Sequence, residues 1–224
     1  MPRHARVIVP GLPHHFVQRG HNRQAMFVET RDYEYYLSNL REWKIALGLE
    51  VYSYCLMTNH VHLIVRATDE LSAIPQLMKR LAGRQTRFVN SVEGRSGSLW
   101  EGRYKISPVD TDAYLLSCCR YVELNPVKAQ MVASPELFPW SSYPARAGLV
   151  THDWLDEPPT LTSLGPTPED RIQKVRNRSV PVSGPGFCEV TDSGFNLYSA
   201  KPQGRATATI VAPGSKHRIY DIWI

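Results

Sequence analysis

Two histidines separated by one residue stand at the start of an apolar segment, TNHVHLIV, in which they are His60 and His62. In a β-strand, side chains at positions i and i+2 point to the same side, so the two imidazoles share a face while Val61 points into the core. Two neutral imidazoles placed in this way can bind one metal ion. A second interpretation stays open, because H-x-H is short and common: one histidine caps a turn and the other is a half-buried polar group.

A second candidate group lies further along the chain, in the sequence RYVELNPVKA. Tyr121 and Asn125 are four residues apart, so on a helix they lie on one face about one turn from each other. A tyrosine hydroxyl can act as a nucleophile and hold a covalent intermediate. Because its ordinary pKa is near ~10, it needs a metal ion or a base to attack at neutral pH. The alternative is a core tyrosine, with Asn125 as the polar end of the helix.

The elements that must position these residues follow from hydrophobic periodicity. The sequence predicts strands over residues 14–19, 50–57, 60–67 and 104–109, and helices over about residues 31–47, 72–92 and 111–124. Thr58 and Asn59 form the predicted turn of a hairpin. The resulting order, β-α-β-β-α-β-α, is an α+β fold: the ferredoxin-like plan with an antiparallel sheet, helices on one face and one added helix.

Charge is unevenly distributed along the 224 residues, whose formal net charge is +5. Residues 1–110 carry 15 Lys and Arg against 10 Asp and Glu, and residues 111–165 carry 3 against 6. A basic first half suits a polyanionic partner. We see neither a membrane span nor a signal peptide, and four cysteines without a C-x-x-C pair indicate reduced thiols, so we expect a cytoplasmic protein.

The hydrophobic pattern weakens towards the end of the chain, where Pro, Gly, Ser and Thr recur. We therefore expect one main domain over residues 1–150. Residues 151–224 are expected to form a C-terminal extension that is partly irregular or disordered.

Several stretches together resemble a known family: VPGLPHHFVQRGHNRQ, YCLMTNHVHLIV, LWEGRYK, YVELNPVKA and FPWSSY. They span roughly residues 5–145 in the order found in the single-tyrosine HUH transposases, and they most resemble the REP-associated tyrosine transposases. The resemblance implies an HUH endonuclease fold in which the added helix carries the catalytic residue. It also implies a bacterial, nucleoid-associated protein that binds single-stranded DNA with hairpin structure, and a monomer, with a homodimer as the alternative.

By this resemblance Tyr121 is the catalytic nucleophile, which attacks the scissile phosphate and forms a 5′-phosphotyrosine link. His60, His62 and Asn125 would be the ligands of a divalent ion. Imidazole ligands by themselves suggest zinc or another transition metal, whereas Mg²⁺ prefers oxygen. Family members use Mg²⁺ or Mn²⁺, and we follow the resemblance because the site has too few protein ligands for a closed structural zinc.

Basic residues distributed over the first half are candidates for DNA phosphate contacts, and Trp100 is a candidate for stacking on an unpaired base. The alternative for each basic residue is a solvated surface charge, and for Trp100 a core residue. The basic candidates are Arg19, Arg23, Lys79, Arg80, Arg84, Arg87, Arg103 and Lys105.

Two rival functions remain open from the sequence. One is a metal-dependent phosphodiesterase in which water is the nucleophile and Tyr121 is structural. The other is a DNA-binding protein that no longer cuts, such as a decayed copy of a mobile element.

Overall fold

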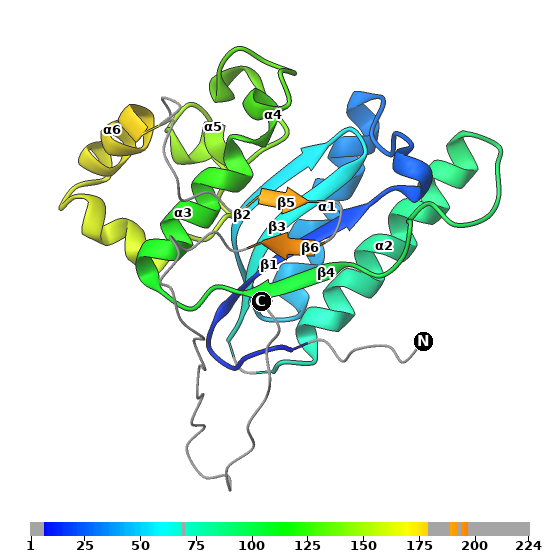
Figure 1. The fold of residues 1–224 in the computed structure, drawn as a ribbon, viewed down its shortest axis with the longest axis horizontal. Helices are drawn as coiled ribbons and strands as arrows, with labels where there is room; N and C mark the ends of the chain where they lie inside the picture. The colour runs from blue at the N-terminus through cyan, green and yellow to red at the C-terminus, as the bar shows by residue number, and fades with distance from the viewer. Residues whose placement is uncertain (1–6, 69, 179–188, 192–193, 197–224) are drawn as a thin grey trace, which may run out of the picture. The chain divides into compact units, whose positions relative to one another are not determined.

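The computed structural model describes residues 7–68 and 70–178, and the backbone of residues 189–191 and 194–196 (Figure 1). The chain divides into two compact units. The first, Met1–Val180, holds every element from β1 to α6, and the second, Pro181–Ile224, holds a two-stranded antiparallel hairpin of β5 (Glu189–Thr191) and β6 (Gly194–Asn196).

A four-stranded antiparallel sheet forms the centre of the first unit. Its strands lie in the order β2-β3-β1-β4. Their bounds are β1 Pro13–Arg19, β2 Leu49–Met57, β3 His60–Ala67 and β4 Lys105–Pro108. The predicted α+β fold and its antiparallel sheet are confirmed.

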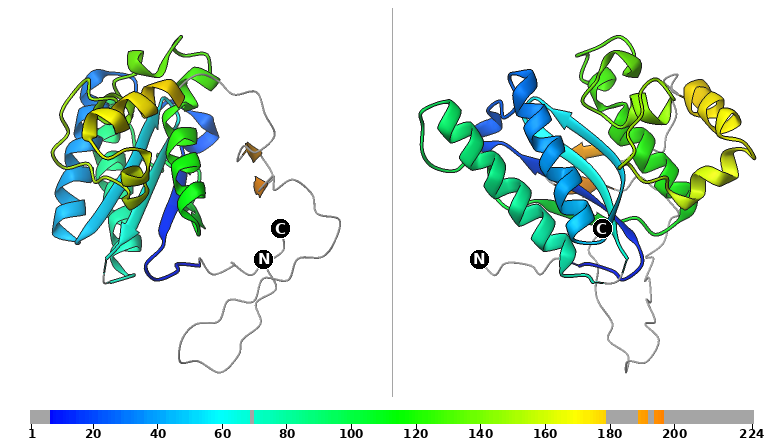
Figure 2. Two further views of the ribbon diagram at one scale, coloured as in Figure 1. Left: turned by 90° about the vertical axis from the view of Figure 1, so that its left-hand side faces the viewer. Right: turned by 180° about the vertical axis from the view of Figure 1, so that it is seen from behind.

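Helices cover both faces of this sheet. Helices α1 (Thr30–Ala46) and α2 (Ala73–Val92) lie on one face, and α3 (Asp112–Glu123) lies on the other, as the edge-on view in Figure 2, left, shows. Each side has its own apolar core, one under α1 and α2 and one under α3. The expectation that the helices of the ferredoxin-like plan lie on one face is therefore confirmed by α1 and α2. No side was predicted for the added helix, α3, which covers the other face.

The alternation of β3 separates the two cores. Val61, Leu63 and Val65 are buried in the core of α1 and α2, whereas Ile64 belongs to the core of α3. Because side chains alternate along a strand, His60 and His62 lie on the same side as Ile64. The predicted common face of the two histidines is thus the face that α3 covers.

The FPWSSY stretch protects the outer edge of β2. The amide of Leu56 donates to the carbonyl of Trp140 at 2.9 Å, and the amide of Ser142 donates to the carbonyl of Tyr54 at 2.9 Å. The exposed backbone groups of an edge strand can pair with other chains, and this segment forms hydrogen bonds with some of those groups of β2.

Short helices complete the first unit. They are η1 His21–Arg23, α4 Asn125–Lys128, η2 Pro135–Leu137, α5 Tyr143–Arg146, η3 Pro159–Leu164 and α6 Pro168–Arg178.

Helix α6 lies where the composition gave no expectation of a helix. The hydroxyl of Thr167 accepts from the amide of Asp170 at 3.1 Å, and the Asp170 carboxylate accepts from the amide and the hydroxyl of Thr167. This reciprocal capping, with Pro168 at the first helical position, is a local helix-start signal. The predicted boundary at residue 150 stays a prediction.

Candidate active site

The two histidines of β3 stand at its beginning, directly after the hairpin turn. Their ring centroids are 4.9 Å apart. His62 is 2% exposed, and His60 is partly buried. The Nδ1 of His60 is 2.7 Å from the Oδ1 of Asn59, so this nitrogen donates to the amide oxygen. The Nε2 of His60 is then the ring atom left for a ligand.

A third histidine, His15 of β1, belongs to the same cluster and was not predicted from the sequence. Its Nε2 is 3.0 Å from the Nδ1 of His62, and the two rings stack with centroids 5.2 Å apart. The ladder between β1 and β3 pairs His15 with Ile64 and Val17 with His62, so His15 points to the face of α3. The alternation of side chains along β1, PHHFVQR, could have indicated that His14 and His15 point to opposite faces of the sheet. It could not have indicated the contact between His15 and His62.

Burial keeps all three imidazoles neutral near neutral pH. It lowers the pKa of His15 to about 4. It also lowers the pKa of His60 to about 4, with a smaller contribution from the charge of Arg19. The pKa of His62 lies well below its ordinary value, through burial first and then through His15, His60, Arg19 and Lys128. A neutral imidazole is the form that binds a metal ion.

Helix α3 brings Tyr121 to this cluster. The Tyr121 ring meets the ring of His62 edge-on at a centroid distance of 5.8 Å and the ring of His15 at 6.0 Å. Thr111 caps the start of the helix by accepting from the amide of Tyr114 at 3.2 Å. The geometry thus brings Tyr121 against His62 of the H-x-H pair, and the roles of these residues stay predictions.

A buried ion pair fixes the end of α3 against the sheet. The Glu123 carboxylate accepts from the Nε of Arg146 at 2.7 Å and from the hydroxyl of Ser142 at 2.7 Å. Arg146 also donates to the carbonyl of Tyr52 on β2. Glu123, which stands two residues after Tyr121, therefore has a structural position that turns it away from the histidines.

Lys128 is a second site residue that was not predicted. The sequence suggested that the helix stops at Asn125-Pro126, but Pro126 lies in the first turn of α4, where a proline is tolerated. The new helix carries the Nζ of Lys128 to 4.4 Å from the centroid of the Tyr121 ring. A cation thus lies over the ring of the candidate nucleophile.

The imidazole nitrogens of the two histidines are suited to a divalent ion whose remaining ligands are phosphate and water oxygens. The Nδ2 of Asn125 donates to the carbonyl of Tyr121 at 2.8 Å, which leaves its Oδ1 as the atom able to serve an ion. Among residues 7–68 and 70–178, no three His, Cys, Asp or Glu side chains form a group able to hold a metal ion. Two neutral imidazole nitrogens on one face would leave the other positions of an ion to phosphate and water, as a catalytic ion requires. The role of Asn125 as a third ligand stays a prediction.

Some of the predicted DNA-binding residues lie near this cluster. Arg19 is directly opposite His60 in the ladder, and Lys105, opposite Val17, points to the same face from the edge strand β4. The carbonyl of Arg23 accepts from the side chain of Asn59 in the hairpin turn at 3.2 Å. Arg103 is exposed just before β4.

The other predicted basic residues lie on α2, across the sheet from Tyr121 (Figure 1). The guanidinium of Arg80 lies 3.8 Å from the centroid of the Trp43 ring, and Arg84 pairs with Glu42 at 2.6 Å. The structure does not bring Lys79, Arg80, Arg84 and Arg87 to the histidines, so DNA binding by α2 stays a prediction. The periodicity of an amphipathic helix shows which residues face solvent, not which side of the sheet the helix covers.

Trp100 is a core residue rather than a stacking platform. It is 7% exposed, and its indole nitrogen donates to the carbonyl of Ala82 at 3.0 Å. The expectation that it stacks on an unpaired base is therefore not supported by its position.

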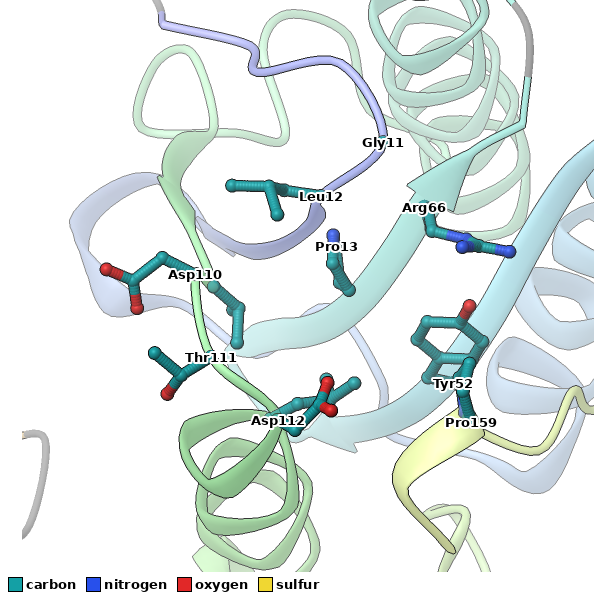
Figure 3. Close-up of a pocket in the computed structure, with 11 residues that line it drawn as sticks. Gly11, Leu12, Pro13, Tyr52, Arg66, Asp110, Thr111, Asp112 and Pro159 are labelled. Carbon is teal, nitrogen blue, oxygen red and sulfur yellow. The ribbon is translucent and has the colours of Figure 1, made fainter. Parts of the chain in front are cut away.

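A small cavity lies at the opposite end of β3 from the histidines (Figure 3). It holds about 120 Å³, and Tyr52, Arg66 and Asp112 are among its lining residues. Pockets for drug-sized ligands measure roughly 300–1,000 Å³, so this one has room for a few water molecules only. It shares no residue with the cluster around Tyr121.

Comparison with known families decides how this cluster is interpreted. Residues 8–125 match the family described as "Transposase IS200 like". The chain belongs to this family. The matched range contains His60, His62, Tyr121 and Asn125, and the family membership expected from the sequence is confirmed. IS200-like transposases process DNA and are generally metal-dependent. A search of curated proteins gives no match.

Two solved structures show similarity to this IS200-like transposase. One is a REP-associated tyrosine transposase bound to a REP hairpin, with a TM-score of 0.54 and 18% identity. That match covers 70% of this chain and 93% of the other. The second, assigned as a transposase from Deinococcus radiodurans R1, has a TM-score of 0.38 and 24% identity, with 51% and 92% coverage. At these identities the first match supports the fold.

No helix among the described residues of the transposase is long and apolar enough to cross a membrane. Among the described residues, Cys55, Cys118 and Cys119 are buried and form no disulfide, and Cys188 lies outside them.

Proposed function

We propose that this transposase is a metal-dependent endonuclease and strand transferase that cuts single-stranded DNA through a covalent link to Tyr121. The observation that carries the proposal is the contact between Tyr121 on α3 and His62 on β3, with ring centroids 5.8 Å apart. Neither residue alone identifies an activity, but a tyrosine in contact with a pair of neutral histidines is suited to phosphoryl transfer.

The proposed step is a direct displacement at phosphorus. The Tyr121 oxygen loses its proton and bonds to the scissile phosphorus, while the bond from phosphorus to the 3′ oxygen breaks. The 3′ oxygen leaves as a hydroxyl after gaining a proton. The 5′ phosphate stays on Tyr121, and the link keeps the free energy of the phosphodiester, so attack by a 3′-OH rejoins a strand without ATP.

Two cations of the chain support this displacement. Lys128, 4.4 Å from the centroid of the Tyr121 ring, stabilises the negative charge that the phenol oxygen carries as it attacks. Arg19 lies opposite His60 in the ladder, and we propose that it contacts an oxygen of the scissile phosphate. These roles are electrostatic and need no proton transfer by either side chain.

His60 and His62 would hold the divalent ion through their Nε2 atoms, with the Oδ1 of Asn125 as a third ligand. A bound ion polarises the phosphate and stabilises the charge that develops on its oxygens. We propose Mg²⁺ or Mn²⁺, because an open set completed by phosphate and water oxygens suits these ions better than a closed structural zinc site.

The proposed substrate is single-stranded DNA beside a hairpin of the REP type. The fold shared with the transposase bound to a REP hairpin supports this substrate class. Arg23, Arg103 and Lys105 are proposed to bind backbone phosphates close to the cut. Contacts by the α2 residues would be made further from it.

A monomer is the proposed state of the active enzyme. The buried pair of Glu123 and Arg146 anchors α3 to the chain's own sheet, so each subunit would complete its own site. A dimer that exchanged its α3 helices would instead make this pair between subunits.

The decisive experiment uses a single-stranded hairpin oligonucleotide with a fluorescent label at its 3′ end, since that fragment would stay on the enzyme. Incubation with Mn²⁺ should give a labelled protein band that survives denaturing electrophoresis. Tyr121→Phe should abolish the band, and Tyr114→Phe, on the same helix, should retain it.

Each alternative outcome points to a different function. Cleavage that persists in Tyr121→Phe would show that water is the nucleophile and would favour a phosphodiesterase. Hairpin binding without cleavage, in wild type and with either ion, would show a DNA-binding protein that no longer cuts.

A further inference from the structure

His15 has no role in the function proposed above, yet it is buried in the middle of the site. It is 2% exposed, and its Nε2 lies 3.0 Å from the Nδ1 of His62, which comes from the neighbouring strand. Burying a polar ring in this way is costly unless its nitrogens are hydrogen-bonded. The pair therefore calls for an explanation beyond packing.

The hydrogen bond fixes which nitrogen of His62 can serve an ion. A neutral imidazole has one N–H donor and one acceptor nitrogen, so in the contact one histidine donates and the other accepts. If His15 accepts, the proton of His62 is on Nδ1 and its Nε2 lone pair is free. If His15 donates, the proton of His62 is on Nε2 and that atom cannot bind a metal ion.

His60 shows the same arrangement with a different partner. Its Nδ1 is 2.7 Å from the Oδ1 of Asn59, an atom that can only accept. Its proton is thereby placed on Nδ1, and its Nε2 is left free. Both histidines of the H-x-H pair are thus held through Nδ1, by Asn59 for His60 and by His15 for His62.

We propose that His15 is a positioning residue, which accepts a hydrogen bond from Nδ1–H of His62 and so directs the Nε2 of His62 towards the divalent ion. The role rests on the proposed metal-dependent function. Partners that orient a metal-binding histidine typically change metal affinity by about 10–100-fold when they are removed.

The first test is the Mn²⁺ affinity of the DNA-free protein, measured by isothermal titration calorimetry. His15→Leu keeps the volume and removes the acceptor, and we expect it to weaken Mn²⁺ binding by about 10–100-fold. His15→Gln places an amide oxygen near the position of Nε2 and should recover most of the affinity.

The chain offers a matched control in His14, the preceding residue of β1. It is also fully buried, but it lies on the opposite side of the strand, where its Nε2 accepts from the amide of Val9 at 3.0 Å. His14→Leu removes an equal buried imidazole, and we expect Mn²⁺ affinity within about threefold of wild type. If His14→Leu and His15→Leu weaken Mn²⁺ binding equally, the loss of affinity comes from general destabilisation of the fold, and the proposal is overturned.

A second measurement needs no substitution. Long-range ¹H–¹⁵N NMR spectra of protein with ¹⁵N-labelled histidine distinguish the two neutral tautomers. We expect the ion-free wild type to carry the His62 proton on Nδ1. A proton on Nε2 of His62 would overturn the proposal, whether or not the variants fold.

The two hypotheses can fail separately. If wild type forms the Tyr121 adduct and His15→Leu binds Mn²⁺ as tightly as wild type, the role of His15 is refuted and the function stands. If Mn²⁺ binding depends on His15 but no adduct forms on DNA, the strand-transfer function is refuted and the positioning role stands.

Discussion

Replacing Glu123 with glutamine should loosen the helix that carries Tyr121. The two side chains of the Glu123–Arg146 pair are 4% and 7% exposed, and their Nε–Oε1 distance is 2.7 Å. The substitution keeps the shape of the carboxylate but leaves the guanidinium of Arg146 buried without a counter-charge. Breaking such a pair from one side costs about 3–5 kcal/mol.

We expect a loss of about 3 kcal/mol in the free energy of unfolding, at the lower end of that range, because the glutamine oxygen can still accept from Ser142. Urea titration followed by circular dichroism measures the loss. Glu42→Gln is the matched control, because Glu42 pairs with Arg84 at a similar distance but is 51% exposed. The control should change stability by less than about 1 kcal/mol.

A double variant, Glu123→Leu with Arg146→Met, removes both charges. It should be more stable than Glu123→Gln alone, because neither charge is left buried and unpaired. A loss below about 1 kcal/mol in Glu123→Gln would refute the reasoning, since it would show that the pair is solvated and does not anchor α3.

Three further perturbations address other parts of the site. Lys128→Gln should slow formation of the DNA adduct by about tenfold, because the cation over the ring of the attacking tyrosine is lost, whereas Lys174→Gln, at an exposed position of α6, should leave the rate unchanged; equal rates for both would contradict the role of Lys128. The free energy of unfolding should fall as the pH drops from about 6.5 towards 4. The pKa of His15 is about 4 in the folded protein and about 6.5 in the unfolded chain. Between these values the unfolded state binds a proton that the folded state does not, so acid favours unfolding. The slope is at most roughly 1.4 kcal/mol per pH unit for that histidine, and urea midpoints that do not move between pH 7 and pH 5 would contradict it. Gly20→Ala should destabilise by about 1–3 kcal/mol, because the added Cβ would lie 2.6 Å from a backbone oxygen, whereas Gly102→Ala, with open space around it, should not; calorimetric melting of both variants tests this.

Periodicity alone predicted the part of the site that lies within single elements. The alternation of β3 places His60 and His62 on one face and Val61 on the other. Asn125 follows Tyr121 at helical spacing, although it begins the separate helix α4, and its side chain donates to the carbonyl of Tyr121. These relations depend on backbone geometry only, which every strand or helix shares.

Relations between elements were harder to predict. The contact of His15 with His62 depends on which strands are neighbours and on their register, and neither is encoded in the alternation of one strand. The position of Lys128 depends on a helix that restarts at Asn125-Pro126, where proline usually marks an end. The basic face of α2 was visible in the sequence, but the side of the sheet that it covers was not.

The identity of the residue that becomes linked to DNA tests the central claim most directly. Protein incubated with the hairpin oligonucleotide and Mn²⁺ is digested with trypsin and nuclease, and the modified peptide is sequenced by mass spectrometry. The proposed function predicts a nucleotide joined through its 5′ phosphate to Tyr121. A nucleotide on any other residue, or cleaved DNA with unmodified Tyr121 throughout, would contradict it.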